Sequence, residues 1–165
     1  MVPPLRQTSD SQSELGSKGD RAKEADQRPR VLLVDDDADM LLTIAQTLEG
    51  EFHVIGLAED GRQALRAASR SPDIVVLDIS MPDMSGIEVA AQIRKAGCKA
   101  KVVFLSMYDD PDFVEAAMSA ALAYVVKPRL ATDLVPALRN VLEGHTFTSP
   151  SVHLPQNPRY LRPHS

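Results

Sequence analysis

Cysteine and long hydrophobic runs are scarce in this sequence, and each scarcity excludes a class of protein. The only cysteine, Cys98, cannot form an internal disulfide or a cysteine metal cluster, and we interpret it as a small residue following a helix. No apolar run approaches the roughly 18 residues of a membrane span, and the N-terminus lacks a signal-peptide pattern. We therefore expect a cytoplasmic protein with no membrane association and no disulfide framework.

The sequence also has fewer basic residues than acidic ones. The chain carries 18 Lys and Arg residues against 23 Asp and Glu residues, for a net charge of −5. This balance argues against general nucleic-acid affinity, which normally shows as a basic field. The 165 residues, 44% of them hydrophobic, suffice for one globular domain with tails.

Composition divides the chain into three segments. Residues 1–29 contain Gly, Ser, Gln and Pro with balanced charges, so they bury too little surface to offset the entropy of ordering, and we expect a flexible extension. Residues 30–144 form the folded domain. Residues 145–165 have no acidic residue, and four prolines preclude a long helix. We expect an extended, Pro-rich tail there.

Within residues 30–144, apolar runs alternate with segments of helical periodicity. Strands are expected near 31–34, 53–57, 74–78, 101–106 and 123–126, with a helix after each. Asp37, Asp60, Ser85 and Asp110 stand where the first four helices begin, and Gly144 closes the fifth. Four strands are apolar throughout, as burial on both faces requires. The pattern predicts an α/β fold with one doubly wound parallel sheet.

Polar residues follow four of these strands at the point where each strand ends. Asp35 and Asp36 follow the first, Asp78 ends the third, Ser106 ends the fourth and Lys127 follows the fifth. Because parallel strands end at the same edge of a sheet, we expect these side chains to lie together, where open α/β sheets bind ligands.

The combined chemistry of this set indicates phosphoryl transfer. Three carboxylates in one cleft repel unless a cation neutralises them, and oxygen ligands suit magnesium. An ionised Asp beside such a metal can attack phosphorus and form an acyl phosphate. Lys127 offsets charge on the transferring group, and the Ser106 hydroxyl donates to it.

Each of these residues also has a purely structural interpretation. Asp37, or one of the two preceding aspartates, can cap a helix; Ser106 can satisfy a strand end; and Lys127 can be a solvated surface residue. Their coincidence on one sheet edge favours the shared chemical role.

The motifs VLLVDDD, VVLDISMPDMSG, VVFLS and AYVVKP resemble those of bacterial response-regulator receiver domains over about residues 30–144. The resemblance implies a flavodoxin-like three-layer fold with sheet order 2-1-3-4-5. It also implies that Asp78 accepts a phosphoryl group from a histidine kinase or phosphotransfer protein. Magnesium is implied on Asp36, Asp78 and the Ser80 backbone carbonyl, with Asp35 acting through water and Lys127 contacting the phosphate.

The same resemblance implies a switch and an output. Ser106 and Tyr124 correspond to the switch pair, which alters the surface of the fourth helix, fifth strand and fifth helix. Pro128 follows Lys127 at a position that often has a cis bond in this family. SMYDDP and LEGHTFTSP resemble receivers of the nitrate- and luminescence-regulator type that precede DNA-binding domains.

Three residues depart from the family pattern. Met107 replaces a common Ala or Gly beside the site, which predicts narrower access for the phosphoryl group. Ala120 and Ala123 replace glycines; if either position needs a positive φ, alanine costs on the order of 1 kcal/mol there.

Two rival functions remain open at this point. One is a phosphatase with an Asp nucleophile, although Ser80 stands where such enzymes have a second Asp. The other is a binding module that works without phosphorylation. For the receiver, we expect no direct DNA binding, because residues 145–165 have no helical apolar period and only two arginines. Output then passes through a protein partner, a homodimer or onward phosphoryl transfer.

Overall fold

Strands and helices alternate along residues 27–150, which are the residues that the structure, a computed structural model, describes. The strands are β1 (Arg30–Val34), β2 (His53–Ala58), β3 (Ile74–Asp78), β4 (Lys101–Ser106), β5 (Ala123–Val126) and β6 (Phe147–Thr148). The helices are α2 (Ala38–Leu48), α3 (Gly61–Ala68), α4 (Gly86–Lys95), α5 (Pro111–Met118) and α6 (Leu130–Leu142), with a 3-10 turn, η1 (Lys127–Arg129), before α6. Most of the predicted extension and tail lies outside these residues.

The strands form one parallel sheet in the order β2-β1-β3-β4-β5-β6. The predicted five-strand order 2-1-3-4-5 is confirmed, and the sheet has a sixth strand that was not predicted. The N–H of Phe147 donates to the Leu122 carbonyl and the N–H of Ser149 to the Tyr124 carbonyl, each at 3.0 Å. The ordered structure therefore continues past Gly144, into the segment predicted to be a tail.

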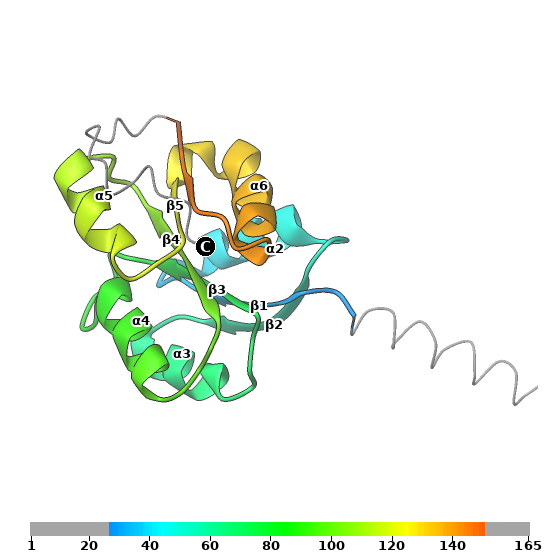
Figure 1. Cartoon of the computed structure of the whole chain (residues 1–165). Helices are drawn as coiled ribbons and strands as arrows, with labels where there is room; N and C mark the ends of the chain where they lie inside the picture. Colours follow the sequence, from blue (N-terminus) through cyan, green and yellow to red (C-terminus); the bar gives the residue numbers. More distant parts are fainter. Residues whose placement is uncertain (1–26, 151–165) are drawn as a thin grey trace, which may run out of the picture.

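Helices cover both faces of the sheet and create two hydrophobic cores (Figure 1). On one face, α2 and α6 pack through residues such as Leu41, Leu134 and Leu138. On the other, α3, α4 and α5 pack through residues such as Ala64 and Ile93. β3 lies between these layers with all five residues buried, as its apolar sequence predicted.

The four predicted helix starts are confirmed by capping hydrogen bonds. The side chains of Asp37, Asp60, Ser85 and Asp110 each accept from backbone N–H groups in the first turn of the helix that follows. Each bond satisfies donors that have no partner inside the helix. These caps fix where each strand-to-helix connection ends, and all four lie on the side of the carboxyl ends of the strands.

Backbone geometry decides two of the expectations raised by the sequence. Among the described non-glycine residues, only Ser71 and Asp83 have positive φ, so Ala120 and Ala123 carry no such strain. No described peptide bond is cis. The Lys127–Pro128 bond is therefore trans, and the expectation of a cis bond there is wrong.

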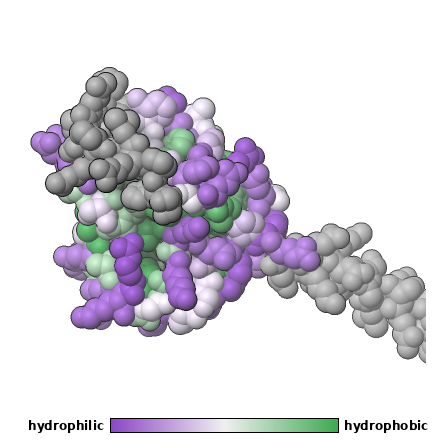
Figure 2. Space-filling view, in the orientation of Figure 1, coloured by the Kyte–Doolittle hydropathy of each residue, from purple (hydrophilic) through white to green (hydrophobic). Residues whose placement is uncertain are grey.

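The surface seen in Figure 2 is mostly hydrophilic, with small hydrophobic areas between the charged side chains over α3 and α4. Long charged side chains cover apolar surface in this way while keeping their charge in water. In the described part of the chain, none of the helices has both the length and the hydrophobicity needed to cross a bilayer.

Candidate functional site

The acidic residues expected at the sheet edge do come together. Asp35 and Asp36 follow β1, Asp78 ends β3, and the two strands pair in register up to Val34 and Leu77. One ligand oxygen of each carboxylate lies within 4.8 Å of those of the other two. Asp35 and Asp78 are buried at 0% and 2% exposure, while Asp36 is exposed. Two charges are thus held in a region of low dielectric, with a third at its mouth.

Asp35 is fixed on one side and open on the other. Its N–H donates to the Ala58 carbonyl at 3.0 Å, and its Oδ1 accepts from the Asp37 N–H at 2.9 Å. Its Oδ2 lies 2.9 Å from Lys127 Nζ, yet no described donor reaches it in hydrogen-bond geometry. A buried carboxylate oxygen of this kind needs a cation to stabilise it.

Lys127 supplies one such cation. Lys127 directly follows β5, and its Nζ contacts Asp35 Oδ2 at 2.9 Å and Asp78 Oδ1 at 3.4 Å. Burial alone would lower the pKa of Lys127, but its contacts with the Asp35 and Asp78 carboxylates outweigh it and raise the pKa. The ammonium group therefore stays charged and bridges two carboxylates.

Asp78 lies at the centre of the site. Its Oδ1 accepts from the Ser80 N–H at 3.2 Å. Burial, and then repulsion from Asp35, raise the pKa of Asp78 to about 6, against the opposing attraction of Lys127. At neutral pH the carboxylate is still mostly ionised, but at a cost that a bound cation would reduce.

Gly86, at the start of α4, lets this helix approach Asp78 closely. A Cβ at Gly86 would clash with the carbonyl oxygen of Asp78 and come within 2.9 Å of Ile79 Cα. The Gly86 N–H instead donates to the Ile79 carbonyl at 2.9 Å. In the sequence Gly86 is only the last residue of the motif VVLDISMPDMSG, and the close approach is visible only in the fold.

The donor set fits magnesium. Three carboxylates offer oxygen ligands, one of their buried oxygens lacks a hydrogen bond, and the mouth of the site is exposed at Asp36. Magnesium takes few protein carboxylates and retains several waters, so such an open acidic set suits it. The side chain of Ser80 is exposed, and its backbone follows Asp78 by two residues.

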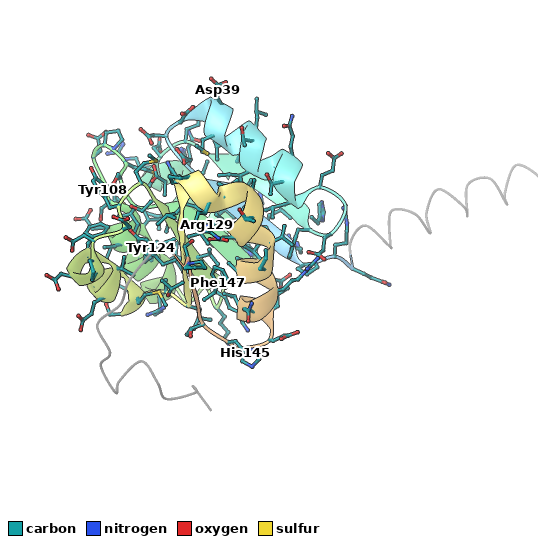
Figure 3. All side chains as sticks on the ribbon, turned by 90° about the horizontal axis from the view of Figure 1, so that it is seen from above. Asp39, Tyr108, Tyr124, Arg129, His145 and Phe147 are labelled. Carbon is teal, nitrogen blue, oxygen red and sulfur yellow. The ribbon has the colours of Figure 1, made fainter. Side chains whose placement is uncertain are left out.

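Ser106 and Tyr124 are both buried, and both bind the backbone of Tyr108. Ser106 Oγ accepts from the Tyr108 N–H at 3.1 Å, and the Tyr124 hydroxyl donates to the Tyr108 carbonyl at 2.6 Å. Burial chiefly raises the pKa of Tyr124, a hydrogen bond from Ser106 lowers it, and nearby Asp109 raises it. Figure 3 shows Tyr124 beneath Tyr108 on the same side of the domain. The two predicted switch residues thus meet through one loop residue.

The loop that carries Tyr108 is exposed and presents two large apolar side chains to solvent. Met107 and Tyr108 are 63% and 57% exposed, and the Tyr108 ring packs edge-to-face on Phe113 with centroids 5.8 Å apart. Met107 was expected near the site from the sequence, but the Tyr108 backbone was not, because main-chain hydrogen bonds do not depend on residue identity.

Comparison with known protein families agrees with this site geometry. Residues 31–139 match the model of the response regulator receiver domain. The chain belongs to this family: it contains a receiver domain of a two-component response regulator, whose general function is phosphorylation on an aspartate. The resemblance noted from the motifs is confirmed.

Curated relatives are regulators rather than classical enzymes. The chain is 38% identical to the transcriptional regulatory protein PdtaR of Mycobacterium tuberculosis over 112 residues, which cover 66% of this chain and 54% of PdtaR. It is 38% identical to the transcriptional regulatory protein PrrA of Mycobacterium tuberculosis over 127 residues, 74% of this chain and 54% of PrrA. This chain thus spans about half the length of these relatives.

Solved structures share the fold. A two-component response regulator of the LuxR family from Aurantimonas matches with a TM-score of 0.72 at 30% identity, over 76% of this chain and 93% of that one. The isolated receiver domain of RcsB from Salmonella enterica, determined with a phosphomimetic, matches with a TM-score of 0.70 at 26% identity, over 76% and 96% of the two chains.

Proposed function

We propose that Asp78 accepts a phosphoryl group from a histidine kinase or phosphotransfer protein in the cytoplasm. The observation that carries the proposal is the contact of Lys127 with both Asp78 and Asp35 beside a third carboxylate. An Asp78 oxygen attacks phosphorus and forms the acyl phosphate, while the donor's P–N bond breaks. The departing imidazole nitrogen keeps the electron pair and takes up a proton.

In this proposal the other site residues hold the reacting groups. Asp36, Asp78 and the Ser80 carbonyl would hold magnesium, with Asp35 acting through water, and the ion would supply positive charge for the phosphoryl oxygens. Lys127 moves part of its contact from Asp78 to the phosphoryl group, and the Ser106 hydroxyl donates to it. Both residues already lie at this edge, so little reorganisation is needed.

The switch follows from the shared partner of Ser106 and Tyr124. If Ser106 turns toward a phosphoryl oxygen, its bonds to the Tyr108 N–H and to Tyr124 weaken. Tyr124 then repacks beneath the loop, and the surface of α5, β5 and α6 changes for a partner or a second copy. The phosphoryl group shifts this equilibrium only by the contacts that differ between the two states.

Output is proposed to pass through protein contacts and not through DNA binding by the receiver itself. Relatives are named transcriptional regulatory proteins. In this chain, residues 27–150 form the receiver sheet and the helices that cover it, and no separate DNA-binding unit lies among these residues. DNA contact by these residues would also face the repulsion of the acidic edge. A gel-shift assay of the phosphorylated chain with genomic fragments at physiological salt should show no specific complex; a specific complex would contradict the proposal.

Intact mass after incubation with acetyl phosphate and magnesium tests the phosphorylation directly. The wild-type chain should gain one phosphoryl group, and excess EDTA should prevent the gain. Asp78→Asn should abolish it, whereas Asp83→Asn, which changes an exposed aspartate of the adjacent loop, should leave it intact. Full labelling of Asp78→Asn would refute the proposal, and no labelling of wild type would favour the phosphorylation-independent binding module.

A further inference from the structure

Two buried polar residues near the end of β5 have no part in the proposed chemistry. Ser149, just after β6, is 1% exposed, and Asp133, in the first turn of α6, is 5% exposed. A buried carboxylate and a buried hydroxyl are costly unless they are hydrogen-bonded, so their partners define their role.

Ser149 binds β5 at two points. Its N–H donates to the Tyr124 carbonyl at 3.0 Å, and its Oγ accepts from the Val126 N–H at 3.1 Å. Its hydroxyl is also hydrogen-bonded to the Asp133 carboxylate. The Ser149 hydroxyl thus accepts the bond from β5 that the next carbonyl of a longer β6 would accept. Through Asp133, it also connects this end of the sheet to α6.

Asp133 is in turn held by Arg129 of η1. Arg129 Nε and Nη2 donate to the two Asp133 oxygens at 2.8 Å and 3.2 Å. Burial would raise the pKa of Asp133, but the bonds from Arg129 and Ser149 outweigh it and lower the pKa. The carboxylate is therefore a charged anchor, and Ser149 attaches β6 to it (Figure 3 shows Arg129 at the start of α6).

This anchor brackets Lys127. Val126, whose N–H is bound by Ser149, directly precedes Lys127, and Arg129 follows it by two residues. Without the Ser149 hydroxyl, the Val126 N–H would be left buried and without its partner, since Val126 is 4% exposed. The backbone on both sides of Lys127 is thus held by one hydrogen-bonded chain that ends at the C-terminal strand.

We propose that Ser149 is a positioning residue. It holds the end of β5 so that Lys127 reaches Asp78, and it couples the docking of β6 to the phosphoryl group on Asp78. The inference rests on the proposed phosphorylation of Asp78. A phosphoryl group gives Lys127 a further anionic contact and so favours the state in which the end of β5 is held. By linkage, a firmly docked β6 favours binding at Asp78 to the same extent.

Beryllofluoride with magnesium is the probe, because it mimics the phosphoryl group without turnover. Ser149→Ala should weaken its apparent affinity by about three- to tenfold, in line with loss of a buried hydrogen bond whose effect is partly transmitted to Lys127. Ser149→Thr, which keeps the hydroxyl, should restore most of the affinity. Ser119→Ala is the matched control, because the Ser119 hydroxyl makes a bond of 2.7 Å at the far end of α5.

Amide hydrogen exchange distinguishes this coupling from a purely structural role of Ser149, in which beryllofluoride would not change the exchange of the β6 amides. Beryllofluoride should slow exchange of the Phe147 and Ser149 amides, which donate to the Leu122 and Tyr124 carbonyls. By linkage, the slowing should be of the same size as the three- to tenfold affinity difference expected for Ser149→Ala. All variants are compared at a temperature where circular dichroism shows them folded. If Ser149→Ala does not fold, Ser149→Cys, which keeps the volume but bonds weakly, takes its place.

Equal beryllofluoride affinity of Ser149→Ala and wild type would overturn the inference, even if the variant is less stable. So would unchanged exchange of the β6 amides on binding. If wild type neither binds beryllofluoride nor is labelled by acetyl phosphate, the proposed function itself fails. The two failures are therefore distinguishable.

Discussion

The two edges of the sheet differ in what they bury. All five polar residues that are buried in the described part of the chain lie toward the carboxyl ends of the strands: Asp35, Asp78, Ser106, Asp133 and Ser149. At the amino-end edge, cavities of about 610 Å³ and 470 Å³ share four lining residues that are exposed or half-buried: Gly97, Cys98, Lys99 and Lys101. A cavity of about 570 Å³ also lies at the carboxyl ends, over the connections that follow β2 and β3, but none of the five buried polar residues lines it.

Cavities thus occur at both edges, and shape alone does not single out the edge that buries polar groups. At the carboxyl-end edge, burial and repulsion from Asp35 raise the pKa of Asp78 to about 6. Perturbed groups held by specific partners are the stronger indication of a functional site. The predictions below test the two edges against each other.

The largest effect is expected from the two lysines that stand at opposite edges. Lys127→Ala removes the cation that contacts Asp35 and Asp78, and should slow labelling by acetyl phosphate by about a hundredfold, as expected for loss of one charge-stabilising donor. Lys101→Ala, in the amino-end cavity, should label at the wild-type rate. Rates are measured by intact mass over time; comparable slowing in both variants would remove the distinction between the edges.

Two neighbouring aspartates should separate metal binding from helix capping. Asp36→Ala should remove most magnesium affinity in a calorimetric titration while leaving stability nearly unchanged, because Asp36 is exposed. Asp37→Ala should retain magnesium binding but lower the free energy of unfolding by about 1 kcal/mol, because it loses the N-cap of α2. If Asp37→Ala lost magnesium binding and Asp36→Ala lost stability, the roles of the two aspartates would be exchanged.

The last expected effect is a pH-dependent gain in stability. The pKa of Asp78 is raised to about 6 from 3.8, so the folded state binds the carboxyl proton more tightly than the unfolded chain does. The stability that this proton contributes is fully present below about pH 4 and is lost as pH rises through 6. Without magnesium at pH 7.5, Asp78→Asn should therefore be more stable than wild type by on the order of 1–2 kcal/mol, after allowance for solvent screening.

Urea unfolding at pH 7.5 and pH 4 measures this difference, which should shrink toward zero at the lower pH. Asp83→Asn, at an exposed position, serves as the control and should show no such pH dependence. A stability gain that persisted unchanged at pH 4 would mean that packing, and not ionisation, distinguishes Asn from Asp at this position.

Much of the fold could be predicted because its signals are local and periodic. Burial on both faces gave β3 and β4 continuous apolar runs, and Asp37, Ser85 and Asp110 cap helices within four residues of themselves. β6 was missed because a strand of two residues, Phe147–Thr148, has no period to detect. It forms because Leu122 and Tyr124 present unpaired carbonyls at the sheet edge, and this depends on residues far away in sequence.

The sequence by itself determined which groups meet at the site. Parallel strands end at one edge, so Asp35, Asp36, Asp78 and Lys127 had to converge once the alternation of strands and helices was recognised. Only the tertiary structure decided how they are held: that Lys127 bridges two carboxylates, that Ser106 and Tyr124 share the Tyr108 backbone, and that Ser149 ties β6 to β5. Convergence follows from topology, which periodicity reveals, whereas hydrogen bonds depend on positions to within a few tenths of an ångström, which only packing sets.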